Sequence, residues 1–446
     1  MSSLDYLKNN SLIRKFPTFR NDFVNGCWKW IEGKKLDDNA AGLWRVHDRL
    51  YDLTDFIPKH PGGRAWLEIT KGTDITEAFE SYHLSSRPSD VLDNYCVGVA
   101  TRERNYRYTF DDNGFYKTLK RKIGQKMKTV DRSVEIKSKI IHDLTLVAFL
   151  MSVVFVSRVQ PSDYVNVNYI APVIIAGLLL EWLVSMSHNF LHKADNWRMY
   201  TGNLSMAATR DMRVFHILSH HMYPNTYADL ETTFFDPHFK WLPIEVKDLQ
   251  YKIQSIAVHV NIHVLYFFNM LRMRVQGFFW GIQETFFWDD LVMFIIPAIL
   301  YITGTQSSDF FEPIYKWLHI IIAASVFHVI GLINRGHHTP TTIHQGDEIF
   351  TYDFGEYQMN AVCDRPGANT NILTILTLYG EQVLHQLFPS IDAAVLPQLK
   401  ETLLETCKQF DIEMKTCSIV GSVIGQYKQM YRDELYIGKN NNRNVS

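Results

Sequence analysis

Four apolar runs constrain the fold of this chain more than any other feature, because each is about as long as a helix that crosses a lipid bilayer. Residues 1–139 are polar, and the runs follow at about 140–159, 169–187, 286–303 and 314–333. A spanning helix needs about 20 residues, and in lipid only helices and closed barrels satisfy the main chain. We therefore predict an all-α membrane domain made of two transmembrane hairpins.

The distribution of positive charge orients these hairpins. Residues 117–139 hold nine Lys or Arg, whereas the loop 304–313 holds none. Because basic residues stay on the cytosolic side, both termini and both long polar regions are predicted to face the cytosol. Residues 255–280 are aromatic but interrupted by charge, so we expect a helix that lies in the membrane interface, with a fifth crossing as the alternative.

Composition narrows the class of protein. A chain of 446 residues favours two or more domains, and a net charge of −2 with a pI near 6.8 argues against a nucleic-acid binder. The five cysteines are odd in number and contain no CxxC pair, which predicts reduced thiols facing the cytosol. The first 25 residues have no apolar core, so no cleaved signal peptide is expected. The predicted segments are a first domain (25–101), a basic juxtamembrane linker (102–139), the membrane domain (140–390) and a cytosolic C-terminal helical segment (391–446).

Two histidines of the first domain lie close together in the sequence, one in a turn and one after a helical stretch. His60 lies in the tight turn "HPGG", and His83 follows the helical stretch "TDITEAFESY", 23 residues later. Two imidazoles on opposite walls of an apolar pocket suit a flat iron porphyrin. With both axial positions filled, such a centre would transfer single electrons.

The segment from about 40 to 101 resembles the cytochrome b5 family, through "HPGG", "GTDITEAF" and the later His83. The resemblance implies a small α+β domain that binds haem b through His60 and His83. It also implies an electron donor such as cytochrome b5 reductase. Four acids near the expected haem edge could dock a basic reductase, or could simply form a solvated helix face: Asp74, Glu77, Glu80 and Asp90.

Further histidines cluster just beyond the predicted spans. In "HNFLH", His188 and His192 are four residues apart, and on a helix they share one face. The stretch "HILSHH" repeats this spacing with His216 and His220 and adds His221. Both sets lie on the predicted cytosolic side, so together they could supply the ligands of one metal site.

An acid inside the second span lies seven residues before His188. A carboxylate within a membrane normally faces a partner or a cavity, so Glu181 either orients His188 or another ligand, or serves helix packing.

Possible ligands also follow the last span. Asn334 and His338 are four residues apart, His337 adjoins them and His344 follows. Farther along, "GEQVLHQLFP" (380–389) contains His385. A ligand set of imidazoles, amide oxygens and water suits a redox-active iron with an open position for oxygen. It suits a closed tetrahedral zinc site less well.

These clusters resemble the histidine boxes of the membrane fatty-acid desaturase family, over about residues 140–390. Fused to a haem domain, the chain is similar to front-end lipid desaturases, and as a whole it resembles the insect cytochrome b5-related proteins. The resemblance implies two non-haem irons on the cytosolic side. It implies that the iron ligands are the first box (His188, His192), the second box (His216, His220, His221), Asn334 with His338 or His337, and His385 in the third box.

Two positions depart from the family pattern. Asn189 stands where the first box usually has Asp, and Gln386 replaces the last histidine of the third box, whereas front-end members accept Gln382. A glutamine carbonyl is a weaker donor to iron than imidazole. The second iron could therefore be loosely held, ligated by His337 or His344, or absent.

The resemblance leads to two hypotheses of different classes. The first is an oxidoreductase in the endoplasmic reticulum membrane that desaturates a lipid acyl chain with O2, with hydroxylation as a chemical variant. The second is a membrane-anchored electron carrier or regulatory protein whose di-iron site has decayed.

Overall fold

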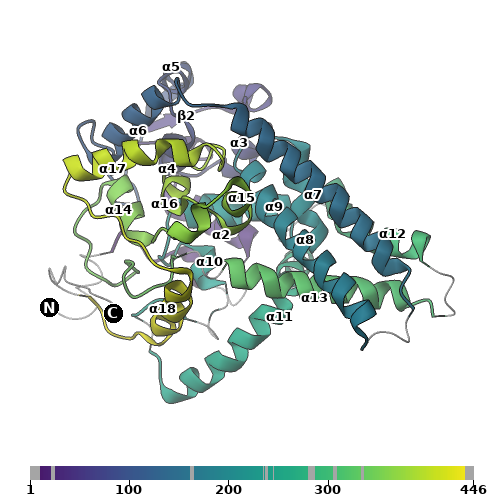
Figure 1. The fold of residues 1–446 in the computed structure, drawn as a ribbon. Helices are drawn as coiled ribbons and strands as arrows, with labels where there is room; N and C mark the ends of the chain where they lie inside the picture. The colour runs from purple at the N-terminus through teal and green to yellow at the C-terminus, as the bar shows by residue number, and fades with distance from the viewer. Residues whose placement is uncertain are drawn as a thin grey trace.

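The fold is taken from a computed structural model, which describes residues 11–21, 26–160, 165–234, 236, 240–244, 246–279, 287–304, 309–332 and 336–436. Three long helices, α7 (Ser133–Ser157), α8 (Val167–Leu191) and α13 (Glu312–Leu332), extend to one side of the molecule (Figure 1). The N-terminal elements and the C-terminal helices gather at the other side (Figure 1).

The first domain is built on a three-stranded antiparallel sheet. Its strands are β1 (Trp44–Val46), β2 (Arg49–Tyr51) and β3 (Cys96–Val99), in the order β1-β2-β3. Trp44 pairs with Tyr51, and both side chains are buried in a core with Leu67. The helical elements of this part are α2 (Cys27–Asp38), η2 (Thr54–Lys59), α3 (Arg64–Thr70), α4 (Thr76–Tyr82) and α5 (Arg87–Asp93), preceded by η1 (Thr18–Asn21). The small sheet with short helices confirms the predicted α+β class of this domain.

The three long helices pack against one another, with α8 between α7 and α13. By length and composition these are the helices among the described residues that could cross a membrane: Ser133–Ser157, Val167–Leu191 and Glu312–Ile330. Gly177 lets α8 approach α13 closely, since a Cβ at this position would lie 2.5 Å from the Cβ of Ala323. A helical domain with apolar helices that could cross a membrane is thus present.

The predicted span over 286–303 has a different form in the structure. Its described part consists of η6, a 3-10 helix (Trp288–Phe294), followed by the nine-residue α12 (Ile295–Thr303). The reason is that Asp289 and Asp290 are buried against protein, where Asn203 donates to Asp289 and Arg274 forms an ion pair with Asp290. The apolar α-helix therefore begins only after these two acids, at Ile295, and is shorter than the predicted span.

Helix α11 (Leu249–Phe279) packs along α13 and has non-helical backbone angles at Leu265. It is not one of the three candidate spans. Its position in the membrane interface stays a prediction.

The remaining helical elements follow α8 in the chain, and η4 and α15 among them pack against it. They are η4 (Trp197–Ser205), α9 (Thr209–Met212), η5 (Arg213–His221), α10 (Leu230–Thr233), α14 (Phe354–Ala361), η7 (Pro366–Asn369), α15 (Ile372–Leu378), α16 (Gln382–Leu387), η8 (Leu396–Leu399), α17 (Lys400–Gln409) and α18 (Ile419–Tyr431). Helix α17 packs against α6 (Phe115–Lys126). After α18, Arg432 binds both carboxylate oxygens of Asp347, each at 2.8 Å.

Three of the four acids that we expected on the haem-domain surface are buried instead: Asp74, Glu77 and Glu80. Arg104 forms ion pairs with the first two, and two lysines of α6 bind Glu80. Both readings of these three acids, a reductase dock and a solvated face, were therefore wrong. Only Asp90 is exposed. The cations that pair with the three buried acids are Arg104, Lys117 and Lys120, which all follow β3 in the chain. These ion pairs therefore join the first domain to the rest of the chain.

Candidate haem and metal sites

His60 and His83 face each other in the first domain. Their ring centroids are 6.5 Å apart, and the Nδ1 atoms contact the main-chain oxygens of Gly63 and Phe79, each at 2.9 Å. Metal–imidazole bonds are about 2 Å long, and a ring centre lies about 1 Å beyond its nitrogen, so two imidazoles on one ion have centres about 6 Å apart. Burial lowers the pKa of His83 to about 4, which keeps its ring neutral and able to ligate. The pair could hold a haem iron.

Five histidines from three segments converge in the domain that follows the linker, at residues 140–390. They are His188, His192, His216, His221 and His385, all buried, and one ring nitrogen from each lies within 4.8 Å of the others. The Nε2 atom of His188 is 2.7 Å from that of His216 and 3.0 Å from that of His192. Two ligands on bonds of about 2 Å are themselves roughly 3 Å apart, so this spacing suits nitrogen ligands of one ion.

The second box lies on a π-helix, η5, and this changes which of its histidines share a face. A π-helix closes hydrogen bonds from i to i+5, so His216 points with His221, and their Nε2 atoms are 2.9 Å apart. The pair that the α-helical spacing predicts is kept as well, because His216, His220 and Glu231 form a second group of possible ligands, and the two histidine rings are 5.4 Å apart. The His220 ring also lies 4.5 Å from that of His337.

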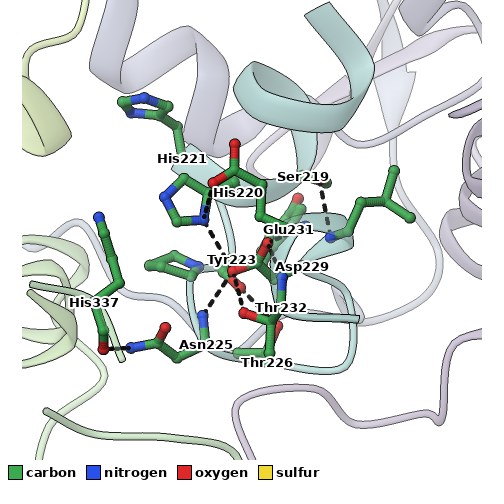
Figure 2. A network of polar contacts seen from close by, with 12 residues as sticks. Ser219, His220, His221, Tyr223, Asn225, Thr226, Asp229, Glu231, Thr232 and His337 are labelled. Carbon is green, nitrogen blue, oxygen red and sulfur yellow. Dashed lines mark hydrogen bonds and ion pairs between the residues drawn. The ribbon is translucent and has the colours of Figure 1, made fainter. Parts of the chain in front are cut away.

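Two acids that the sequence analysis missed hold the outer nitrogens of this box, and Figure 2 shows both of them beside His220. The Glu231 carboxylate accepts from Nδ1 of His216 at 2.5 Å, and Asp229 accepts from Nδ1 of His220 at 3.0 Å. A carboxylate behind an imidazole fixes its tautomer and turns Nε2 toward the metal. The only available signal was that both acids follow the box within ten residues, at the start of α10.

The third box lies on α16, which brings His385 into the five-histidine group. Gln386 is fully buried, and its Nε2 donates to the main-chain oxygen of His221 at 3.4 Å. The amide of Gln382 lies 3.3 Å from Nε2 of His337. The Oε1 atoms of both glutamines are buried without a hydrogen-bond partner among the described residues, so either carbonyl is available to a cation.

The other predicted ligands are placed differently. Asn334 lies outside the described residues. The His338 ring stacks on Trp241 at 4.1 Å, and Nδ1 of His338 is 3.4 Å from Nε2 of His344. The structure does not place His338 or His344 in either histidine group found among the described residues.

Glu181 also has a different partner from the one expected. Its carboxylate accepts from Nδ1 of His328 on α13 at 2.6 Å and from Ser185. The pair joins α8 to α13, which agrees with the packing alternative, and contact with His188 was the wrong expectation. His328 also lines a cavity that reaches His188 and His216. The other walls of the cavity are mainly apolar and include Leu191, Met199, Met212, Tyr266, Phe267 and Met270.

The donor set fits iron. Burial and the neighbouring imidazoles hold the pKa of His221 well below its usual range, so this ring is neutral. Neutral imidazoles, with carboxylate and amide oxygens nearby, can hold iron and leave positions open, whereas structural zinc sites are closed.

Comparison with known proteins agrees with this arrangement. Residues 28–101 match the Cytochrome b5-like Heme/Steroid binding domain, and residues 166–418 match the Fatty acid desaturase family. The chain therefore belongs to the fatty acid desaturase family and carries a cytochrome b5-like domain ahead of the desaturase domain.

Among curated relatives, the chain is 38% identical over 432 residues to the Cytochrome b5-related protein of Drosophila melanogaster, which covers 96% of both chains. It is 46% identical over 137 residues to the Cytochrome b5-related protein of Drosophila virilis, 31% of this chain and 96% of that one. It is 24% identical to Delta(5) fatty acid desaturase A of Dictyostelium discoideum, over 88% of this chain and 87% of the relative. No solved structure matches.

Proposed function

We propose that this protein is a membrane-bound oxidoreductase of lipid metabolism that desaturates a fatty acyl chain. Electrons would pass from a haem held by His60 and His83 to irons held by the histidine boxes. The observation that carries this proposal is the convergence of five buried imidazoles beside an apolar cavity, in a chain of the desaturase family.

The side chains of the protein would hold the irons, set the charge around them and exclude water. His188, His192, His216, His221 and His385 would ligate one iron. His220 and His337, helped by Gln382 or Asn334, would ligate a second. Behind the rings, Glu231 and Asp229 hold Nδ1 protons, which turns the Nε2 lone pairs inward.

The apolar cavity would bind the acyl chain with a methylene near His188 and His216, and its walls would exclude water. Iron held there supplies the O2 chemistry that removes hydrogen from an unactivated carbon. The balance is R–CH2–CH2–R′ + O2 + 2 e⁻ + 2 H⁺ → R–CH=CH–R′ + 2 H2O. The electrons would come from cytochrome b5 reductase or a similar flavoprotein. We place the protein in the endoplasmic reticulum membrane, with the haem, the histidine boxes and both termini in the cytosol.

One observation favours a second candidate. Gln386 occupies the position of a family histidine and hydrogen-bonds to main chain, so an imidazole is lost from the third box. A membrane-anchored electron carrier or a regulatory protein with an eroded di-iron site would need only the haem pair. Acyl hydroxylation would start with the same removal of hydrogen. It is distinguished from desaturation by its product, which carries a hydroxyl group and no new double bond.

The test compares the wild-type chain with His188→Ala. Purified protein is analysed for haem and for iron beyond the haem, and acyl chains are profiled in expressing cells. We expect wild type to hold non-haem iron and to create a new double bond, and His188→Ala to lose both and keep its haem. The matched control is His319→Ala, which removes a histidine of α13 bound to Tyr169 and should change neither. Haem iron alone in wild type would refute the oxygenase and favour the carrier.

A further inference from the structure

One residue lies next to the haem pair in the chain and touches the histidine group with its side chain. Tyr82 immediately precedes His83 in the chain, and its hydroxyl lies 2.6 Å from Nδ1 of His192. The two rings are also stacked, with centroids 6.3 Å apart. A single residue thus adjoins one candidate haem ligand and touches one candidate iron ligand.

The direction of this hydrogen bond follows from the other side of the His192 ring. Its Nε2 atom points into the histidine group, 3.0 Å from Nε2 of His188. A neutral imidazole that ligates through Nε2 carries its proton on Nδ1, so Nδ1–H of His192 donates to the Tyr82 oxygen. Tyr82 therefore stands behind His192 as Glu231 stands behind His216.

The contact is held by packing between the two domains. Trp66 lies beside Tyr82 at 6.1 Å, and the Arg213 guanidinium lies over the Trp66 ring at 4.5 Å. Arg213 also forms an ion pair with Asp195, which the backbone of Gly63 approaches too closely for any Cβ. The positive φ of Gly63 and this approach both require glycine, so the turn after His60 helps to dock the domains.

We propose that Tyr82 is the positioning residue through which electrons pass from the haem pocket to the histidine group, by its hydrogen bond to His192. This inference rests on the proposed function. In each transfer one electron moves. The haem iron goes from ferrous to ferric and an iron at the histidines goes from ferric to ferrous. No bond is broken, and the donor flavoprotein restores the haem electron.

The experiment uses the full chain loaded with haem and iron, without oxygen or lipid. A photoreductant reduces the haem in a flash, and haem absorbance then follows its reoxidation by the ferric non-haem iron. Tyr82→Phe keeps the ring but loses the hydroxyl. The matched control is Tyr223→Phe, since the Tyr223 hydroxyl also crosses the domain boundary, to Glu77 at 3.2 Å, without touching a ring of the five-histidine group. The paramagnetic resonance spectrum of the non-haem iron is recorded for each variant.

We expect reoxidation in Tyr82→Phe to be slower than in Tyr223→Phe by roughly tenfold, the lower end of the loss in metal affinity or activity when such a partner is removed. The non-haem iron spectrum should change and the haem spectrum should not. Equal rates and spectra in the two variants, with fast transfer in wild type, would overturn the role of Tyr82 and leave the proposed function intact. Wild type without non-haem iron, or with no transfer to it, would overturn both. If Tyr82→Phe fails to fold, 3-fluorotyrosine at position 82 keeps the shape and alters the hydrogen bond. An unchanged spectrum and rate would then also overturn the proposal.

Discussion

Arg104 offers the sharpest test of how the first domain is fixed to the rest of the chain. Its guanidinium donates to Asp74 at 2.7 Å and forms an ion pair with Glu77, and both carboxylates are 1% exposed. Removing one partner of a buried ion pair costs about 3–5 kcal/mol, because the other charge stays buried. Asp74 keeps its hydrogen bonds from Thr76, so Arg104→Met should cost about 3 kcal/mol, roughly a hundredfold in local opening.

The cost should depend on pH. Burial alone would raise the pKa of Asp74, but Arg104 and Lys34 outweigh it and hold the pKa below its ordinary value. In wild type this carboxylate therefore stabilises the fold above its unfolded pKa, and that stability is lost as pH falls through the folded pKa. In Arg104→Met, burial should raise the folded pKa, so the penalty is absent in acid and grows as pH rises. The two chains should differ most at pH 7 and converge toward pH 4.

Hydrogen exchange of the amides in β1 and α4, measured by mass spectrometry on the full chain, gives the opening free energy directly. Arg64→Met is the control, because Arg64 pairs with Glu68 on the surface and should matter by less than about 1 kcal/mol. The reasoning would be refuted if the opening free energies of wild type and Arg104→Met differed by less than about 1 kcal/mol at pH 7. It would also be refuted if they differed by the same amount at pH 5 and pH 7.

Two further predictions test the third box and the helix packing. Gln386→His places an imidazole beside His221 and should raise non-haem iron per haem in elemental analysis, whereas Gln386→Asn should not; unchanged iron would mean that this position does not limit the site. Gly177→Val would force its Cβ to within 2.5 Å of Ala323, so α8 and α13 must separate at a cost of about 1–3 kcal/mol and a lower melting temperature. The control Gly98→Ala meets nothing within 4 Å and should melt like wild type.

Local spacing predicted the parts of the site that depend on one segment. The i,i+4 pair His188 and His192 converges because α8 is a regular helix through the first box. In the second box the rule found only part of the arrangement, since His216 and His220 lie in one group of possible ligands, but η5 is a π-helix and also aligns His216 with His221. A π-turn has no distinct pattern of apolar residues, so the sequence offered no way to choose between the two spacings.

The contacts that were missed join distant segments. Glu181 of α8 binds His328 of α13. Asp290, which lies in the predicted third span, forms an ion pair with Arg274 of α11. An acid in an apolar run shows that a partner is needed, but not which one, because that depends on how helices pack. The same limit explains Tyr82, whose partner His192 belongs to another domain.

The buried ion pairs and the Tyr82 contact suggest why the two domains share one chain. A flexible tether alone would keep a donor domain at an effective concentration of about millimolar, in many orientations. Here Arg104 and the lysines of α6 bind three acids of the first domain, and Trp66 and Tyr82 pack against Phe190 and Met199 of the second. These contacts select a single orientation, in which the helix that ends at Tyr82 lies against the first histidine box. The acids that we expected to recruit a soluble reductase instead hold this orientation, so in the proposed function the electron donor to the histidine group would belong to the same folded chain.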